Sequence, residues 1–523
     1  MTSKRNRFNV YSWAILILTA ICIKLIALAS DKLDYDTHFM MLDTNLPLQQ
    51  YVQRGGFGKI LMAYWWVTTR LLGESLIAHR IIPLLINLWA LVAIFQGVRT
   101  QWLEIAHMSF VCLCLFSLNA WATVTVEYPV VNYSVEVLLG ILLYFIFLDV
   151  AFCDMSGSKV LRKLFPIFPL TFFASYTIAI PVCAGVFSIV AWKLLRPSAY
   201  QGIGRFFSLW PFAIVASIPL LLWLVMPFKL LGRNLLPHMY PYFFNRSGYR
   251  QDNLGLLMFL LSGFKNWVRL VVLPVSNDLF FQFFTLREWP FYLLFLVVGL
   301  FTLIFLAKKS LLSPKIVFTI LYLSITFSAI LFGAVLSMFP YGVVRYTGWI
   351  IAPVCALLAY FLSIWIMELD KLFRFGFRSF SQYCLLVICV FAVVTYFQET
   401  YKTRISNYQA IALINPKNTD KVLLSTLVFP AICWHYPNYG DKLIDLGFGK
   451  LIETDDQVRD SRAYKSFINQ VSDRVLKDIK VAAPSRGWVS ESHSPWAQAI
   501  DLNYRLTGEV SAPSIWVGTY SLK

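Results

Sequence analysis

The sequence predicts an all-α polytopic membrane protein with about 11 to 13 transmembrane helices and a small extracytoplasmic α/β domain at its C-terminus. Three observations indicate this class. The 523-residue chain is 58% hydrophobic and only 14% charged, whereas soluble domains carry about 25% charged residues. Apolar runs of about 18 to 25 residues recur between residues 11 and 398, each long enough to cross a hydrocarbon layer roughly 30 Å thick. Residues 399–523 are more polar and read as a separate, soluble segment.

The first apolar run, residues 11–30, follows Lys4, Arg5 and Arg7. It is too long for a cleaved signal peptide, and no A-x-A-like cleavage site follows it, so an uncleaved first helix is predicted. Because basic residues favour the cytoplasm, the N-terminus is expected inside and the loop after residue 30 outside. Further helices are expected near residues 74–97, 104–123, 132–151, 164–194 (two short helices turning near Ser175), 206–228, 289–307, 316–338, 347–366 and 381–397.

The basic residues support this path. They recur in the six predicted inner segments, and the short outer turns hold almost none, with Arg345 as the exception. The net charge of +17 is therefore attributed to contacts with anionic membrane lipids rather than with nucleic acid. A multi-pass protein of a bacterial inner membrane is expected, with its C-terminus extracytoplasmic.

Two domains are predicted, a transmembrane domain over residues 1–398 and a soluble extracytoplasmic domain over 399–523. In the second, "TDKVLLSTLVF" and "RGWVSESHS" have the pattern of short strands, and "DSRAYKSFINQVSDRVLKDI" that of an amphipathic helix.

The loop after the first helix, "LDYDTHFMMLD", is unusually acidic for so apolar a chain. It contains Asp34, Asp36 and Asp43, with His38 among them. A solvated loop would explain this composition. Alternatively, carboxylates at the membrane boundary can bind a divalent cation such as Mg²⁺ or Mn²⁺, or one can accept a proton from an attacking hydroxyl while the other positions it. Asp36 and Asp34 are thus catalytic or metal-binding candidates, and His38 is a substrate-binding candidate.

The next short outer turn, in "ATVTVEYPVVNYS", is predicted to hold Glu127 and Tyr128. Glu127 is either solvated by headgroup water or faces the same compartment as Asp36, which makes it a third catalytic candidate. Tyr128 beside it is a substrate-binding candidate.

Two further stretches supply basic groups. Arg345 and Tyr346, in "MFPYGVVRYTGWIIAP", lie in an outer turn with no other charge. Arg345 either extends to lipid headgroups or offers its planar guanidinium to a phosphate. Lys59 and Arg70 flank the amphipathic, aromatic-rich stretch "KILMAYWWVTTR", which is expected to lie flat in the interface and could cover a site at membrane level.

In their order, these features resemble the GT-C glycosyltransferases, specifically the bacterial type related to protein O-mannosyltransferases and to the lipid A aminoarabinose transferase. The acidic first loop carries the resemblance, together with three stretches: "ILMAYWWVTTRLLGESLIAHRIIPLLINLWALVAIF", "VEYPVVNYSVEVLLGILLYFIF" and "RYTGWIIAP". Many relatives have Asp-Glu in the first loop where this chain has Asp36-Thr37, so its second carboxylate is expected from Asp34. Many also have a His-Pro-Pro-like stretch where this one reads "GGFGK".

The resemblance implies an outward-facing active site that takes a sugar from a polyprenyl-phosphate carrier, with inversion at the anomeric carbon. It implies Asp36 as the base or orienting residue, Glu127 as a second acid, and Arg345 as a ligand of the carrier phosphate. The acceptor would be a hydroxyl of a lipid, a polysaccharide or a protein.

The alternative is a transporter or flippase for a lipid-linked substrate. Proline-interrupted helices and the intramembrane residues Lys24, Asn87 and Glu136 would suit that class. Transporters tend to contain internal repeats, however, and none is evident in this sequence.

Overall fold

The structure is a computed structural model of the whole chain. It describes residues 2–30, 47–49, 59–72, 75–103, 105, 107–127, 131–152, 176–195, 255–267, 297, 299–305, 307–308, 312–336, 347–373, 376–425, 428, 432–433, 435–439, 442–445, 466, 469–470, 473, 475–483, 486, 495–512 and 515–523.

The chain divides into two compact units, which are described separately. Unit 1 comprises Met1–Leu28, Gly55–Leu61 and Ile77–Tyr396, and unit 2 comprises Ala29–Arg54, Met62–Leu76 and Phe397–Lys523. Among the described residues, six helices are long and apolar enough to cross a membrane: Val10–Leu28, Ile77–Gln101, Tyr133–Phe152, Pro314–Val335, Gly348–Leu372 and Phe377–Asn418. The protein is therefore an integral membrane protein with a mainly helical fold, as predicted.

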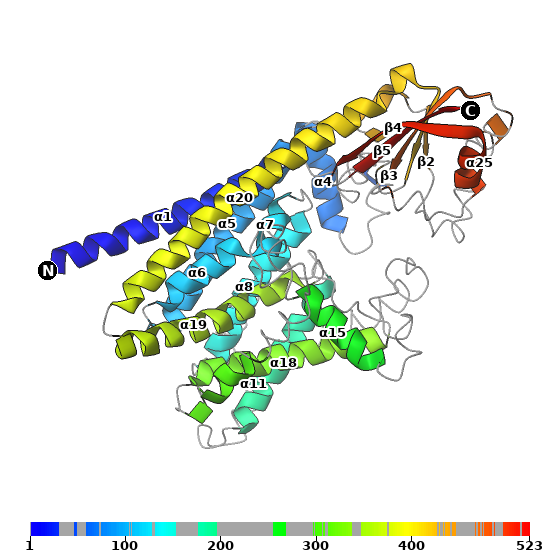
Figure 1. Cartoon of the computed structure of the whole chain (residues 1–523). Coiled ribbons are helices and arrows are strands. Elements are labelled where there is room, and N and C mark those ends of the chain that lie inside the picture. The colour runs from blue at the N-terminus through cyan, green and yellow to red at the C-terminus, as the bar shows by residue number, and fades with distance from the viewer. Residues whose placement is uncertain are drawn as a thin grey trace. The chain divides into compact units, whose positions relative to one another are not determined.

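Unit 1 is a bundle of helices (Figure 1). Its elements are α1 (Thr2–Leu28), α5 (Leu76–Gln101), α6 (Met108–Leu118), α7 (Ala120–Glu127), α8 (Val131–Phe152), η1 (Tyr176–Ile178), α11 (Ala179–Leu195), α15 (Gly255–Trp267), α18 (Pro314–Val335), η8 (Gly348–Ile350) and α19 (Ile351–Phe373). Two helices, α4 (Lys59–Leu72) and α20 (Phe377–Ile414), have residues in both units, and the first residue of α5, Leu76, belongs to unit 2.

The termini of several helices of unit 1 collect at two ends. At one end α1 and α7 finish while α5 and α8 begin, and side-chain contacts join these termini. We call this the Leu28 end. At the opposite end Gln101, the last residue of α5, bonds to Asp149 of α8, and Lys315 of α18 bonds to the Gln101 carbonyl.

Most of the predicted helices that fall on described residues are present, but the one predicted at 104–123 is broken in two. Asn119 has an extended backbone (φ −64°, ψ 121°) between α6 and α7. Its side-chain oxygen accepts a hydrogen bond from the Ala122 amide at 2.8 Å. Asparagine is a favoured residue at helix N-termini because it satisfies such an amide, and this explains the break.

The last predicted span, 381–397, is also wrong in length. The helix α20 continues to Ile414, past the domain boundary predicted at residue 398. No Gly or Pro interrupts the sequence before Pro416, so nothing local stops the helix at the membrane surface. A further helix, α15, lies within residues 229–287, a stretch in which the sequence did not determine the number of helices. The helix predicted at 206–228 lies outside the described residues.

Unit 2 contains a five-stranded mixed sheet in the order β2-β1-β3-β5-β4. The strands are β1 (Lys421–Leu424), β2 (Leu443–Asp445), β3 (Asp478–Ala483), β4 (Tyr504–Ala512) and β5 (Ile515–Leu522). Strand β1 pairs in parallel with β2 and β3, whereas β5 is antiparallel to β3 and β4. The predicted small α/β domain is confirmed.

Local predictions in this domain were less accurate. The strand expected in "TDKVLLSTLVF" is β1. The helix expected over 460–479 is borne out at Ser466, Asn469 and Gln470, which are helical. Its last two residues, Asp478 and Ile479, belong to β3 instead, and more than half of the range lies outside the described residues. Of the strand expected over 486–494, only Arg486 is described, and it is helical.

Both faces of the sheet are covered, which explains the apolar runs in its central strands. Ile500 of α25 (Pro495–Asn503) packs in the cluster on one face, and Ile411 and Ile414 of α20 pack in that on the other. Lys480 donates to the carbonyls of Leu413 and Ile414, the last two residues of α20. A cation at a helix C-terminus stabilises the orphan carbonyls there, so the sheet fixes the end of α20.

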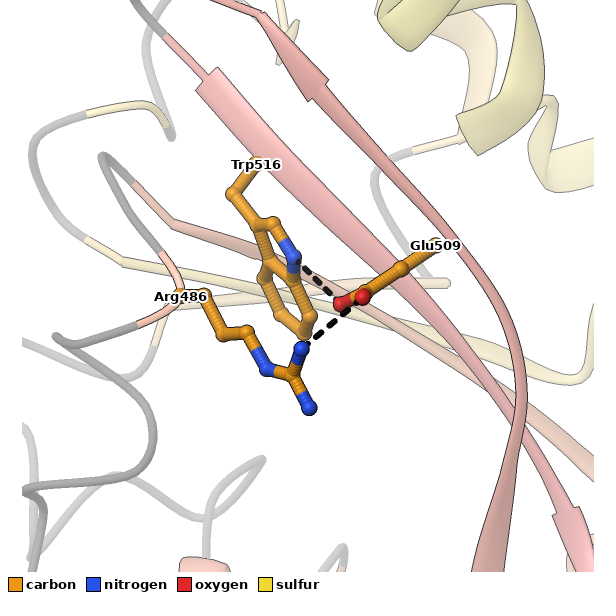
Figure 2. Close-up of polar contacts among 3 residues, drawn as sticks. All are labelled: Arg486, Glu509 and Trp516. Carbon is orange, nitrogen blue, oxygen red and sulfur yellow. Dashed lines mark hydrogen bonds and ion pairs between the residues drawn. The ribbon is translucent and has the colours of Figure 1, made fainter.

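Glu509 of β4 makes two contacts, which contribute unequally to the stability of the sheet (Figure 2). It pairs with Arg486 at 2.9 Å, and that arginine side chain is 64% exposed. Its other oxygen accepts from the indole Nε1–H of buried Trp516 at 3.0 Å. An exposed ion pair contributes about 0–1 kcal/mol, whereas an orphaned buried donor costs about 1–3 kcal/mol.

We therefore expect Glu509→Leu to destabilise the sheet by about 1–3 kcal/mol and Arg486→Ala to have little effect. Hydrogen–deuterium exchange of β4 and β5 in the full-length protein measures both. Equal effects of the two substitutions would show that the ion pair, not the indole bond, is the stabilising contact.

Candidate functional site

Polar and charged side chains are buried within the apolar helices at the Leu28 end. Placing such groups inside a membrane is costly, and in membrane proteins they mark functional sites by default. The set comes from five helices and comprises Lys24, Arg80, Asn87, Thr123, Thr125, Glu127, Ser134 and Glu136, together with the Tyr396 side chain.

Lys24 lies in the last turns of α1 and is fully buried. Its ammonium donates a hydrogen bond to the Thr123 hydroxyl of α7 at 2.9 Å, and it lies 6.0 Å from the centre of the Phe116 ring. The charge of Glu127 also acts on it. Thr123 and Glu127 are four residues apart and therefore share one face of α7, so Lys24 extends toward the face that carries the acid.

Glu127 is the last residue of α7 and is 3% exposed. The sequence predicted Glu127 in a short outer turn, but it is the last residue of α7 and its side chain is buried. Its Oε1 accepts a hydrogen bond from the Tyr396 hydroxyl of α20. Glu127, at the end of α7, is therefore bonded to a residue in the middle of α20.

Arg80 of α5 fixes the point at which the acidic loop begins. It is 2% exposed, and its Nη1 donates to the carbonyl of Leu28 at 3.3 Å. Leu28 is the last residue of α1, and its carbonyl is one of the four that a helix C-terminus leaves without an intrahelical partner. Ser30, which follows, is also buried.

Asn87, within α5, joins the beginning of α8 and the end of α7. Its amide nitrogen lies 3.1 Å from the Thr125 hydroxyl and 3.1 Å from the Ser134 hydroxyl. Ser134 in turn donates to the Thr125 carbonyl at 3.0 Å. These bonds satisfy buried polar groups that would otherwise be expensive in an apolar environment, and they fix the end of α7 that carries Glu127.

The segment after Arg345 and Tyr346 is packed against the same helices. A Cβ added at Gly348 would lie 2.9 Å from the Trp121 indole nitrogen of α7 and 3.2 Å from a methyl carbon of Val137 of α8. Thr347 and Trp349 beside it are buried. The chain that carries the predicted phosphate ligand therefore enters the Leu28 end.

The stretch predicted to be interfacial is helix α4, which begins at Lys59. Arg70 in its last turn is exposed, and its guanidinium lies 4.6 Å from the centre of the Trp66 ring. An exposed cation on an aromatic ring suits the polar boundary of a membrane.

Of the predicted site residues, the structure thus places Glu127, Arg70 and the backbone of Lys59. The others, Asp34, Asp36, His38, Tyr128, Arg345 and Tyr346, lie outside the described residues. In the part of the chain that is described, no group of three or more His, Cys, Asp or Glu side chains could hold a metal ion. The divalent cation at Asp34 and Asp36 stays a prediction.

Sequence reasoning gave Arg80 and Tyr396 no role. Arg80 is a charged residue inside an apolar run, and this was a signal that could have been used. Tyr396 is one of many aromatic residues in apolar helices, so no pattern in the sequence distinguishes it. Lys24 was noticed, but as a feature of the transporter alternative.

Comparison with known proteins supports the fold. No protein-family model matches the chain, and neither does any curated protein sequence. The crystal structure of ArnT from Cupriavidus metallidurans in the apo state matches with a TM-score of 0.50 and 11% identity, over 99% of this chain and 98% of that one. ArnT from Cupriavidus metallidurans bound to undecaprenyl phosphate gives a TM-score of 0.49 and 12% identity over the same shares. The GT-C resemblance is thus confirmed at the level of fold.

Proposed function

We propose that the chain is an integral membrane glycosyltransferase that moves a sugar from a polyprenyl-phosphate carrier to a hydroxyl acceptor on the extracytoplasmic face, with inversion. One observation carries the proposal: buried charged groups of several helices gather at the Leu28 end of the bundle, where the acidic loop begins. The overall match to a GT-C structure supports the same scaffold.

Chain connectivity limits where the undescribed candidates can lie. Arg345 is three residues from Gly348, so their Cα atoms can be at most about 11 Å apart. Asp36 is eight residues from Leu28 and lies within about 28 Å of it by the same limit. Tyr128 directly follows Glu127.

The chemistry then divides among these groups. In the substrate the anomeric carbon is bonded to a phosphate oxygen, and this bond breaks as the acceptor oxygen attacks from the opposite face. Arg345, with Lys59 or Arg70, stabilises the charge that develops on the departing phosphate. Asp36 accepts the hydroxyl proton or orients the acceptor, with Asp34 as the second carboxylate. A single displacement of this kind inverts the anomeric centre.

Placement in a bacterial inner membrane, with the N-terminus cytoplasmic and the C-terminus extracytoplasmic, belongs to the same proposal. Residues 1–398 would be the catalytic domain and 399–523 the extracytoplasmic domain. A divalent cation held by Asp34 and Asp36 is the alternative use of these carboxylates, since Mg²⁺ and Mn²⁺ prefer oxygen ligands.

The test is to incubate purified protein with radiolabelled polyprenyl-phosphate sugars and a membrane extract, and to identify what becomes labelled. We expect label to move to a glycolipid, a polysaccharide or a protein. A second assay in sealed vesicles measures transbilayer movement of the same lipid. It tests the alternative that the protein is a transporter. Movement of the intact lipid without transfer of its sugar would overturn the proposal.

A further inference from the structure

One face of α20 stays exposed along most of the helix, which is a single continuous element in Figure 1. Residues three and four positions apart share a helix face. The exposed residues at this spacing, which we call the exposed row, are Tyr383, Val387, Val390, Val394, Phe397, Tyr401, Arg404 and Tyr408. Each of its apolar and aromatic members is at least 46% exposed. A continuous exposed apolar face marks contact with lipid or with another molecule.

The chemistry of the row changes at a spacing that matches a bilayer. Between Tyr383 and Tyr401 the row holds only valines and Phe397. These two tyrosines are separated by about 27 Å along the helix axis, close to the roughly 30 Å of a hydrocarbon layer. Tyrosine is enriched at both boundaries of that layer. The row between the two tyrosines therefore suits hydrocarbon, and Tyr401 suits its boundary.

Beyond Tyr401 the row becomes cationic. Arg404 is exposed, and its guanidinium lies 5.8 Å from the centre of the Tyr408 ring. The Tyr401 ring stacks on Phe397, with centres 6.2 Å apart and planes at 12°. Arg404 lies about 4.5 Å past Tyr401 along the axis, and the headgroup layer extends about 5–7 Å beyond the hydrocarbon on each side. Arg404 is therefore at headgroup level.

Arg404 is the charged member of this row, and the other charges nearby in α20 point elsewhere. Glu399 is the only acid in the sequence of α20, and it lies about 140° around the helix from Arg404. Lys402 is exposed but lies about 160° around. A planar guanidinium flanked by two phenols is suited to phosphate oxygens, which it can bind in a bidentate manner.

A second copy of the chain is a poor occupant of this face. Two copies insert in a membrane with the same orientation, so their α20 helices would run parallel. Around a two-fold axis each member of the row would then face its counterpart. Two Arg404 guanidiniums would lie opposite each other, and like charges placed face to face disfavour association. Lipid has the complementary charge.

We propose that the exposed row of α20 faces lipid and that Arg404 binds the phosphate of an anionic lipid headgroup where α20 leaves the membrane. The membrane boundary then crosses α20 at Tyr401, and residues 402–414 of the helix lie outside the hydrocarbon. This inference does not depend on sugar transfer.

The test places the photo-crosslinking residue p-benzoylphenylalanine at Ile405, which is exposed beside the row. The full-length protein is held in nanodiscs of equal phosphatidylglycerol and phosphatidylcholine, and mass spectrometry identifies the adducts. We expect adducts with phosphatidylglycerol to exceed those with phosphatidylcholine by about fivefold. Arg404→Gln should remove most of this excess. Lys402→Gln, which removes an equal charge on the other side of the helix, is the matched control and should keep it.

The same crosslinker at Val390, about 21 Å earlier in the row, should react with both lipids alike in every variant. Equal adducts of the two lipids at Ile405 in the otherwise wild-type protein would overturn the proposal, as would an excess that survives Arg404→Gln. Adducts with a second copy of the chain would assign the face to a dimer instead. Lipid adducts at Val390 without any at Ile405 would place the boundary before Tyr401 and refute the headgroup site.

Discussion

Asp36→Asn is expected to reduce sugar transfer by about 10²- to 10⁴-fold while leaving the affinity for the lipid carrier unchanged. Asparagine keeps the size of the side chain but cannot accept the acceptor's proton. In the proposed site the donor phosphate is bound by basic groups elsewhere, so its affinity should not depend on this carboxylate. Transfer of labelled sugar under single-turnover conditions, together with direct binding of the polyprenyl phosphate, measures the two quantities separately.

Asp43→Asn is the matched control, because Asp43 belongs to the same acidic stretch but has no role in the proposed chemistry. It should retain near wild-type transfer. Full activity of Asp36→Asn would exclude it as the base. A chelator distinguishes the two uses of the carboxylates: loss of wild-type transfer on chelation, restored by Mg²⁺ or Mn²⁺, would assign Asp34 and Asp36 to a metal.

The sequence was most informative where a single physical requirement determines the structure. A hydrocarbon layer requires long apolar runs, and this requirement located α5, α8 and α18 to within four residues at each end. It also located α1 and α19, although α1 begins nine residues before the predicted start and α19 ends seven residues after the predicted end. The break at Asn119 was missed because it depends on one side-chain bond to the Ala122 amide, inside a run that is apolar throughout.

The candidate site was predictable only in part, because it too depends on contacts between side chains. Charged residues inside apolar runs are visible in a sequence, but their partners are not. Lys24 and Thr123 are ninety-nine positions apart, and Glu127 and Tyr396 are 269 apart. Only the packing of α1 and α20 against α7 brings these residues together, which is why Glu127 was expected in a short outer turn and not as a buried partner of Tyr396.

Gly140→Ala is expected to have the largest effect on folding. Gly140 of α8 faces the backbone of Trp349 in η8, and a Cβ added there would lie 2.3 Å from the Trp349 Cα. Because the contact is with backbone rather than with the tip of a flexible side chain, it cannot be relieved by a change of rotamer. Overpacking of this kind typically costs about 1–3 kcal/mol, and occasionally more. Thermal unfolding of the purified full-length protein measures the loss.

Gly299→Ala is the control for this prediction, since Gly299 is helical and a Cβ there meets no atom within 4 Å. It should be neutral or stabilising by up to about 1 kcal/mol, because alanine is the better helix former. Equal stability of the two variants would mean that α8 and η8 do not pack as closely as this.

The displacement in Gly140→Ala should also lower transfer in the fraction that remains folded. Pushing Trp349 away from α8 moves the chain that leads to Arg345, only four residues earlier, and with it the proposed ligand of the carrier phosphate.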